Sequence, residues 1–418
     1  MSLHDDMVQM ADRAVAASRA LARLTTRKKN AILEAMADEL ESRRDAIKDA
    51  NARDMEAGEQ AGLTGSLLDR LKLSDARIDS MIKGLRDIVV LKDPVGQEIS
   101  RWMRPNGLEI TKIRVPIGVI AIIYESRPNV TADAASLCFK TSNAVILRGG
   151  KEAVHSNRVL ADALQEGGQK KGLPENSIQL VSTTDRDAIR ELVQMVGKVD
   201  LAIPRGGEGL INAVIEHARV PVIKHYKGVC HVYVDETADI DTAVAISVNA
   251  KCQRPGVCNA IETLLVHQAI AGTFLPKLVE QLKPYKVELR GDEAARAVIP
   301  EMKSATEDDW YAEYLDLILS VRVVKDVHAA VEHINRYGSH HSDSIVAGGD
   351  HAQKIFTQEV DSSTVYVNAS TRFTDGGEFG MGAEIGISTD KLHARGPMGL
   401  EELTTYKYVV HGAGQIRE

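Results

Sequence analysis

The sequence predicts an α/β protein with two doubly wound parallel-sheet domains, a helical N-terminal segment and a small β-rich arm. Three observations lead to this prediction. Residues 1–93 contain no proline and repeat apolar residues at helical spacing. After them, short apolar runs alternate with helical patterns in two successive series, as in parallel βαβ units. Two further β-rich segments, 109–115 and 404–410, stand outside both series.

The composition points to a protein that acts on a small molecule. The chain has 418 residues, of which 44% are hydrophobic, so it is long for a single domain of ~100–200 residues. Its formal net charge of -8 argues against a nucleic-acid partner, which would favour a basic surface. No apolar run approaches the ~18 residues of a membrane span, and no signal-peptide core begins the chain. We therefore expect a soluble, cytoplasmic protein without membrane or nucleic-acid partners.

The helical N-terminal pattern is clearest in residues 7–21, and Pro94 ends the segment. Residues 109–115 then alternate apolar and polar side chains, which is typical of a strand with one wet face. We expect this strand and the one at 404–410 to form an exposed sheet that pairs with another subunit.

Both series of predicted strands consist of short apolar runs with helical patterns between them. The runs of the first series are 117–124, 144–148, 178–182, 201–203 and 220–223. Those of the second series are 231–235, 261–267, 317–324, 344–347 and 364–368. Each series should form one parallel sheet covered by helices, which makes two α/β domains.

The strongest local signal for chemistry is the segment 249–260, Asn-Ala-Lys-Cys-Gln-Arg-Pro-Gly-Val-Cys-Asn-Ala, which precedes a predicted strand. It holds Cys252 and Cys258, two of four cysteines in a chain without a Cys-x-x-Cys pair, so free thiols are expected. Cations favour a nucleophilic thiolate, and Lys251 and Arg254 are close in sequence. Both cysteines share these neighbours, so proximity does not choose between them. A cysteine is also often just a small buried residue.

A second signal is a strand that runs into a glycine turn and then a helix, at residues 144–153. The turn is formed by Arg148, Gly149, Gly150 and Lys151. Free N–H groups at a helix N-terminus, together with two cations, can hold a phosphate there. An ordinary turn between a strand and a helix is the alternative.

A similar turn contains Gly206 and Gly207. The chain has neither a Gly-x-Gly-x-x-Gly fingerprint nor a P-loop, so a dinucleotide would be held differently from the common Rossmann manner. A third cluster, at 337–343, has two adjacent histidines but lacks the carboxylates and spacing of a metal site. We expect it to be a polar loop or a pocket wall, and we expect no metal.

These segments lie within a resemblance that spans nearly the whole chain. Four separated motifs, in order and spacing, resemble those of the γ-glutamyl phosphate reductases (glutamate-5-semialdehyde dehydrogenases), a family of the aldehyde dehydrogenase superfamily. The motifs lie at 115–131, 249–259, 324–345 and 392–400. The resemblance implies an aldehyde dehydrogenase-like fold and places Cys258 in the nucleophile position.

The resemblance also implies an arrangement of domains. Residues 1–229 would form a dinucleotide-binding domain, with its helical N-terminus at 1–93 and an arm strand near 105–116. Residues 230–365 would form the catalytic domain that carries the nucleophilic cysteine. Residues 366–418 would form a return segment and a C-terminal β oligomerisation arm.

The implied reaction is the NADPH-dependent reduction of L-glutamyl 5-phosphate to L-glutamate 5-semialdehyde and phosphate in proline biosynthesis, through a thioester on Cys258. Two departures from the oxidising members are informative. Lys224 stands where those enzymes carry a water-activating glutamate, so the thioester is not diverted to the free acid. Ser126 stands where they carry an asparagine that stabilises the oxyanion, which leaves the backbone N–H of Cys258 as the first candidate donor.

Further roles are implied for the remaining motif residues. Arg127 and Asn129 are expected to bind the phosphate or the α-carboxylate of the substrate. NAD-preferring members carry a glutamate where this chain has Lys151 and a lysine where it has Arg148, which favours NADPH over NADH. A homo-oligomer is expected, with a transient contact to glutamate 5-kinase as a further partner. Two alternatives stay open: an NAD(P)-dependent aldehyde oxidiser of the same superfamily, and a non-catalytic partner of that kinase.

Overall fold

The computed structural model describes residues 2–63, 65–224 and 227–417. Contacts within the chain divide it into two compact units. Unit 1 comprises Met1–Lys224, Gly380–Gly386 and Met398–Glu418, and unit 2 comprises His225–Phe379 and Ile387–Pro397. Each unit contains its own parallel sheet, which confirms the predicted α/β fold.

Unit 1 begins with helices α1 (Leu3–Leu21), α2 (Thr26–Ser42), α3 (Arg44–Gln60), α4 (Ser66–Leu71) and α5 (Asp75–Val90), as predicted for the N-terminal segment. Ser2, Thr25 and Ser74 cap α1, α2 and α5 by accepting a hydrogen bond from a backbone N–H of the first turn. A buried ion pair of 2.5 Å between Lys29 Nζ and Asp93 Oδ2 ties α2 to the segment after α5.

The sheet of unit 1 has the strand order β5-β4-β3-β6 with parallel neighbours. Its elements are β3 (Val119–Tyr124), α6 (Asn129–Lys140), β4 (Ala144–Arg148), η1 (Lys151–Ala153), α7 (Val154–Gln169), β5 (Ile178–Leu180), α8 (Asp187–Val193), β6 (Leu201–Arg205) and α9 (Glu208–His217). Right-handed crossovers put α6 and α7 on one face and α8, packed with α1, on the other. The strand order reverses between β3 and β6, where open α/β sheets bind ligands at their carboxyl ends.

One predicted strand of unit 1 is reduced to a single bridge. Residues 220–223 pair with β6 only at Val222, which bridges Ala202. Pro221 has no N–H to donate, so this segment cannot continue a regular ladder.

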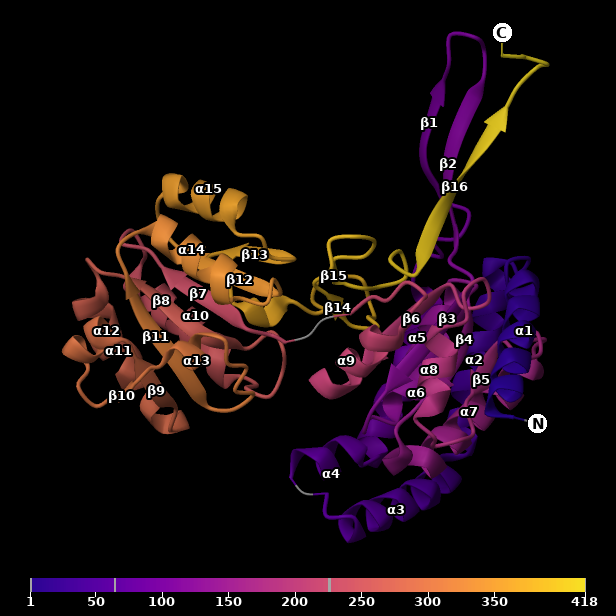
Figure 1. Cartoon of the computed structure of the whole chain (residues 1–418), viewed down its shortest axis with the longest axis horizontal. Coiled ribbons are helices and arrows are strands. Elements are labelled where there is room, and N and C mark those ends of the chain that lie inside the picture. Colours follow the sequence, from indigo (N-terminus) through magenta and orange to yellow (C-terminus); the bar gives the residue numbers. More distant parts are fainter. Residues whose placement is uncertain (1, 64, 225–226, 418) are drawn as a thin grey trace. The chain divides into compact units, whose positions relative to one another are not determined.

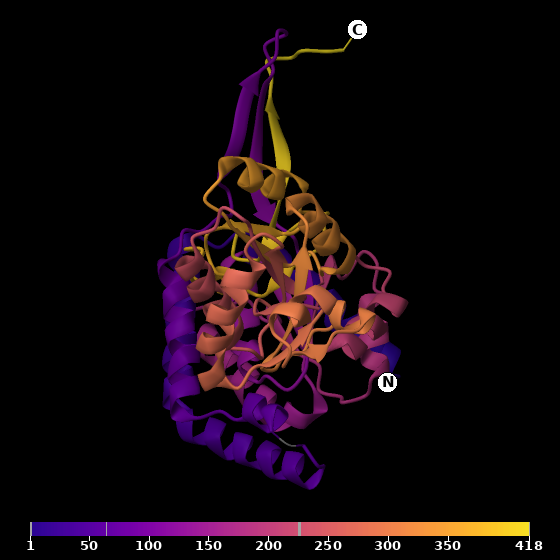
Figure 2. The ribbon, with the colours of Figure 1, turned by 90° about the vertical axis from the view of Figure 1, so that its left-hand side faces the viewer.

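A three-stranded arm extends from unit 1, as Figures 1 and 2 show. It is formed by β1 (Glu98–Met103), β2 (Glu109–Pro116) and β16 (Thr404–His411), all antiparallel, with β2 in the middle. The predicted pairing partners 109–115 and 404–410 are therefore neighbours, while β1 was not predicted. On the arm, the exposed ring of Tyr408 makes edge-to-face contacts with Trp102 and with Tyr406.

The sheet of unit 2 has the order β10-β9-β11-β8-β7-β12-β13, and its neighbours are parallel. Its strands are β7 (Cys230–Val234), β8 (Ile261–His267), β9 (Glu288–Gly291), β10 (Lys303–Ser304), β11 (Ile318–Val324), β12 (Ser342–Val346) and β13 (Thr364–Val367). Its helices are α10 (Ile240–Cys252), α11 (Ala271–Leu282), η2 (Lys283–Tyr285), α12 (Glu293–Val298), α13 (Glu307–Trp310), α14 (Val327–Tyr337), α15 (Asp350–Glu359) and η3 (Thr371–Phe373), and a small hairpin joins β14 (Ile387–Ser388) to β15 (Gly396–Pro397).

Alternate residues of the unit 2 strands feed two separate apolar cores. Val232 and Leu264 pack with α10, α11 and α12, whereas Tyr233 and Leu265 pack with α14 and α15 on the other face. Figure 1 shows these helices on the two sides of the sheet. The alternation follows from the period of two residues along a strand.

The contact-based units differ from the predicted domain boundaries in two places. The first segment of unit 1 ends at Lys224, whereas the predicted boundary was residue 229, which directly precedes β7. The predicted return segment 366–418 is divided, because Ile387–Pro397 belongs to unit 2 and Met398–Glu418 to unit 1. As domain assignments with functions, the ranges 1–229, 230–365 and 366–418 stay predictions. Among the described helices, none is long and apolar enough to cross a membrane.

Candidate functional site

Cys258 lies in the loop between α10 and β8, at the amino ends of the unit 2 strands. The backbone before β7 packs directly against it, since a Cβ built on Gly228 would lie 1.9 Å from the carbonyl oxygen of Cys258. Any larger residue at 228 would push the loop away. The side chain of Cys258 remains partly accessible.

A buried network of hydrogen bonds contacts the Cys258 loop through the carbonyl oxygen of Cys258. The thiol of Cys230 donates to Cys258 O over 3.2 Å and lies 3.6 Å from Nδ1 of His341. The network continues from His341 Nδ1 to Ser342 Oγ (2.9 Å) and on to Thr374 Oγ1 (2.6 Å). Burial raises the pKa of the Cys230 thiol far above its usual range, so Cys230 stays a thiol.

Asn259 joins the Cys258 loop to the segment after β13. Its side-chain Nδ2 donates to Thr374 O (2.9 Å) and Arg372 O (3.4 Å), and its own carbonyl accepts from Thr371 Oγ1 (2.7 Å). These three contacts hold residues 371–374, which include η3, against the residue that follows Cys258.

Lys251 does not have the position that the sequence suggested. Its ammonium group is fully buried and forms an ion pair of 2.5 Å with Glu262 Oε2. Burial raises the pKa of Glu262 to about 7, against the opposing effect of Lys251. Lys251 and Glu262 flank the Cys258 loop in sequence, so the pair closes the base of the loop. Lys251 is thereby committed to Glu262 and not to the thiolate.

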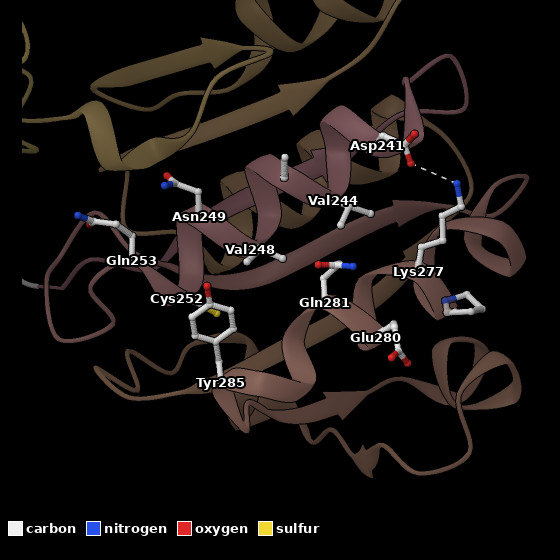
Figure 3. A pocket seen from close by; sticks show the side chains of 12 residues that line it. Asp241, Val244, Val248, Asn249, Cys252, Gln253, Lys277, Glu280, Gln281 and Tyr285 are labelled. Carbon is white, nitrogen blue, oxygen red and sulfur yellow. Dashed lines mark hydrogen bonds and ion pairs between the residues drawn. The ribbon is translucent and has the colours of Figure 1, made fainter.

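Cys252 and Cys258, which the sequence could not separate, lie in different environments. Cys252 lines a groove of about 880 Å³ between α10 and α11 (Figure 3). Lys277 is the groove's basic side chain, and its Nζ is paired with Asp241 Oδ1 at 3.2 Å. Burial raises the pKa of the Cys252 thiol to about 11. A protonated thiol in a groove without an unpaired cation does not suit attack on an anionic substrate, so the geometry favours Cys258.

Arg372 is a residue that the sequence reasoning missed. Its Nε donates to Gln253 Oε1 over 2.8 Å, which places the guanidinium over the Cys258 loop. Burial lowers the pKa of Arg372, as does the charge of Arg254, while the thiolate of Cys258 acts in the opposite direction. Arg372 lies four residues after the predicted strand at 364–368, and no local pattern there signals a contact with Cys258.

Two side chains of the histidine cluster at 337–343, His341 and Asp343, form buried contacts with β7. His341 reaches Cys230 as described above, and Asp343 Oδ1 accepts from the backbone N–H of His231 and contacts its Nδ1, both at 2.8 Å. The described residues contain no group of three or more side chains suited to a metal ion.

In unit 1, Arg148 ends β4 and points into the protein. Its guanidinium donates to Gly149 O (3.0 Å), Thr184 O (3.0 Å) and Asp185 O (3.2 Å), and only 6% of the residue is exposed. Burial lowers the pKa of this guanidinium. Arg148 thus holds the loop after β5 in place, and few of its N–H donors are left to bind a phosphate directly.

The helix N-terminus predicted to receive an anion is already occupied. The carboxylate of Asp54, from α3, accepts from the N–H groups of His155 (3.1 Å) and Ser156 (2.7 Å) in the first turn of α7. Gly149 lies tightly in the turn, because a Cβ there would fall 2.1 Å from Asn157 Nδ2. Asp54 is far away in sequence, so the prediction could not include it.

Lys151 is exposed at a cavity of about 820 Å³ in unit 1. The cavity is lined by the turn after β4, the end of α3, the start of α8 and one side of α9. Gly150 lines it as well, and Arg186 and Arg190 add exposed cations that the sequence reasoning missed. Four carboxylates, Asp54, Glu125, Glu152 and Asp187, also line this cavity beside the predicted cofactor turn.

Carboxylates cover the remaining predicted donors of unit 1. The N–H of Gly207 donates to Glu125 Oε2 (3.0 Å), and a Cβ on Gly206 would fall 2.4 Å from the same oxygen. The N–H and Oγ of Ser126 both donate to Glu152 Oε1, at 2.6 and 2.8 Å. Ser126 has a φ of 42°, in the left-handed region that non-glycine residues rarely adopt.

The two predicted substrate residues sit at the start of α6. Arg127 is exposed, and Asn129 begins the helix with its Nδ2 donating to Asp133 Oδ2 over 2.9 Å. Burial raises the pKa of Asp133 to about 6. Lys224, at the end of unit 1, is partly buried.

Comparison with known proteins covers both units. A family model described as aldehyde dehydrogenase family matches residues 2–316. A gamma-glutamyl phosphate reductase of Moorella thermoacetica is 57% identical over 406 residues, which is 97% of each chain. One of Geotalea daltonii is 53% identical over 418 residues, the full length of both chains. The crystal structure of gamma-glutamyl phosphate reductase from Thermotoga maritima aligns with a TM-score of 0.97 and 49% identity, over 99% of this chain and 100% of that one.

Proposed function

The chain belongs to the aldehyde dehydrogenase family and, within it, to the gamma-glutamyl phosphate reductases, and on this basis we propose that it reduces L-glutamyl 5-phosphate to L-glutamate 5-semialdehyde in proline biosynthesis. The observation that carries the proposal is the full-length similarity, at 53% and 57% identity, to enzymes that bear this name. The accessible Cys258 beside two arginines supplies the chemistry that such a reaction needs.

The proposed reaction uses Cys258 as the nucleophile. Its thiolate attacks the acyl carbon, the carbon–sulfur bond forms, the carbon–oxygen bond to the phosphate breaks, and phosphate leaves with the electron pair. The backbone N–H of Cys258 is our first candidate for stabilising the oxyanion. When bound, the nicotinamide cofactor supplies the hydride that reduces the thioester. Collapse of the resulting thiohemiacetal returns the thiolate and releases the aldehyde.

The cavity of unit 1 fits the adenosine part of a nicotinamide cofactor. Its volume of about 820 Å³ lies within the ~300–1,000 Å³ of typical ligand pockets. Gly150 and Lys151 would hold the cofactor directly, and Arg148 and Gly149 would shape the turn. At Gly206 and Gly207, the N–H of Gly207 donates to the carboxylate of Glu125, so this turn already binds a negatively charged group. We propose NADPH rather than NADH because Lys151, Arg186 and Arg190 offer positive charge to a 2′-phosphate.

Substrate and partner roles remain proposals of the same kind. Arg127 can bind an anionic group of the substrate because it is exposed just before α6, and Asn129, which is hydrogen-bonded to Asp133, would help to orient the substrate.

We propose a cytoplasmic homo-oligomer joined through the β1-β2-β16 arm, since exposed edges and aromatic side chains need a partner. Sedimentation at micromolar concentration should then show no monomer. Co-sedimentation with glutamate 5-kinase would test the transient contact proposed with that enzyme.

The reverse reaction tests the proposed function. Purified protein with glutamate 5-semialdehyde and NADP should form NADPH only when inorganic phosphate is present, since phosphate must release the acyl group from Cys258. NADP reduction that is independent of phosphate would identify an aldehyde oxidiser instead. No reduction at all, with Cys258 intact, would favour a non-catalytic partner of the kinase.

A further inference from the structure

Two guanidinium groups lie beside the Cys258 loop without a carboxylate partner. Arg254 is exposed within the loop itself, and the half-buried Arg372 reaches the loop from η3. Among the residues that the structure describes, neither side chain forms an ion pair. Arg372 makes one side-chain hydrogen bond, from its Nε to the neutral oxygen Gln253 Oε1, so both positive charges remain available to a ligand.

This arrangement is unfavourable without an anion. Like charges held close together repel, and partial burial removes the water that would screen them. Both effects are visible on Arg372, because burial and then the nearby charge of Arg254 lower its pKa, against smaller opposing effects of Cys258 and of Asp375, which, within the described part of the chain, forms no ion pair with it. An anion bound between the two guanidiniums would relieve both costs.

The backbone keeps Arg372 and Cys258 together. Asn259, the neighbour of Cys258, donates to Arg372 O and accepts from Thr371 Oγ1. Gln253 holds the Arg372 side chain from the other end of the loop. Hydrogen bonds therefore fix Arg372 and the loop of Cys258 relative to each other within unit 2.

We propose that Arg254 and Arg372 form the site for the phosphoryl group of the acyl phosphate, and for inorganic phosphate in the reverse reaction. The proposal rests on the proposed function. Phosphorus is separated by only one oxygen from the carbon that Cys258 attacks, whereas the α-carboxylate is four carbon–carbon bonds away. Cations held against the loop of the nucleophile should therefore meet the phosphate. Two guanidiniums also match a dianion better than a carboxylate.

An alkylation experiment tests the site without turnover. Iodoacetate is an anion and iodoacetamide is neutral, and both alkylate the thiolate. The ratio of the iodoacetate rate to the iodoacetamide rate at Cys258, read by mass spectrometry, therefore reports local positive charge independently of the thiolate content. We expect the ratio to fall at least about threefold in Arg254→Gln and in Arg372→Gln. Inorganic phosphate should protect Cys258 of the unsubstituted protein but not of the variants. Arg296→Gln, an exposed arginine of α12, is the matched control.

Kinetics in the reverse direction separate the phosphate from the α-carboxylate. Arg254→Gln should raise the KM for phosphate about tenfold or more and leave the KM for glutamate 5-semialdehyde unchanged. A rise for the semialdehyde alone would assign the arginines to the α-carboxylate and overturn the proposal, as would an unchanged alkylation ratio in both variants. If the unsubstituted enzyme needs no phosphate, the proposed function fails, and phosphate protection of Cys258 still decides whether the anion site exists.

Discussion

The turn after β4 in unit 1 and the Cys258 loop in unit 2 are two candidate sites built in opposite ways. The unit 1 turn lies at the carboxyl ends of its strands, and its predicted residues are consecutive. The Cys258 loop lies at the amino ends of β7, β8 and β12, and its supports come from three distant segments of the chain, 228–230, 341–342 and 371–374.

The difference concerns how each site depends on the buried interior. The unit 1 turn presents Lys151 to an open cavity, and its supporting side chains, Arg148 and Asp54, pair with backbone carbonyl and N–H groups rather than with other side chains. The Cys258 loop rests on buried polar groups, including the Lys251–Glu262 pair and the Cys230–His341 contact. Buried polar groups are costly when one partner is lost. We therefore expect substitutions in unit 2 to have the larger effects.

The largest effect is expected at the nucleophile. Cys258→Ala should lower reductase activity by at least about a thousandfold while the fold survives, because no acyl-enzyme can form. Cys252→Ala is the matched control and should keep most of the activity, since its thiol faces the groove of Figure 3. Circular dichroism would check the fold. If the two results were exchanged, the assignment of the nucleophile would be wrong.

The next effect is on the stability of unit 2. Lys251→Met leaves Glu262 buried without its partner and should lower the free energy of unfolding by about 3–5 kcal/mol. Replacing both, as Lys251→Met with Glu262→Leu, should restore much of the loss. Urea unfolding read by Trp310 fluorescence, in a Trp102→Phe background, would measure it within unit 2.

The matched control for that substitution is Lys277→Met. Lys277 pairs with Asp241 on the surface, where the two side chains are 53% and 86% exposed, and such pairs contribute about 1 kcal/mol or less. Equal losses for Lys251→Met and Lys277→Met would contradict the view that burial makes the difference.

Two buried groups, His333 in unit 2 and Asp133 in unit 1, should make stability respond to pH in opposite directions. Burial, then His231 and Arg322, lower the pKa of His333 in unit 2 from 6.5 to about 2. The unfolded chain takes up this proton near pH 6.5 and the folded chain does not, so the contribution of His333 alone should fall by about 1.4 kcal/mol per pH unit below pH 6.5. Glu262 in the same unit opposes this loss, because its raised pKa of about 7 means that its contribution is regained as the pH falls to 4.5. Asp133 in unit 1 has a raised pKa of about 6, so its contribution to stability is lost as pH rises from 3.8 to 6.

Unfolding of unit 2 at several pH values would measure the first of these slopes. His333→Gln keeps an acceptor for Arg322 Nη1, which now lies 2.8 Å from His333 Nδ1, and should remove the His333 contribution to the slope. His328→Gln, at an exposed position of the same helix, should leave it unchanged. A slope that persists in His333→Gln must come from another group.

The smallest effect is expected at the unit 1 turn. Lys151→Glu should raise the KM for NADPH at least about tenfold, which corresponds to about 1.4 kcal/mol, and barely change the KM for NADH. The reason is that a carboxylate would repel the 2′-phosphate. Arg186→Gln and Arg190→Gln would show whether the cations across the cavity share this role. Equal responses to both cofactors would mean that Lys151 does not contact the 2′-phosphate.

Much of the fold was predictable because periodicity is a local property. The runs at 144–148 and 261–267 became β4 and β8 with the same bounds. The short strands β9 and β10, at one end of the unit 2 sheet, were missed, since their sequences are largely polar and only their neighbours in the sheet make them strands. The run at 220–223 failed as a strand because Pro221 interrupts the ladder.

The sequence by itself determined the family, the two α/β domains and the candidate loop around Cys258, because these follow from motifs and periods within short segments. Only the tertiary structure decided which side chains serve that loop. Lys251 is buried in an ion pair with Glu262, and Arg372 contacts the loop from a segment that is distant in sequence. Asp54 likewise occupied the helix N-terminus that was predicted to be open. The physical reason is that charges and hydrogen-bond donors are paired through space, between segments that the order of residues does not bring together.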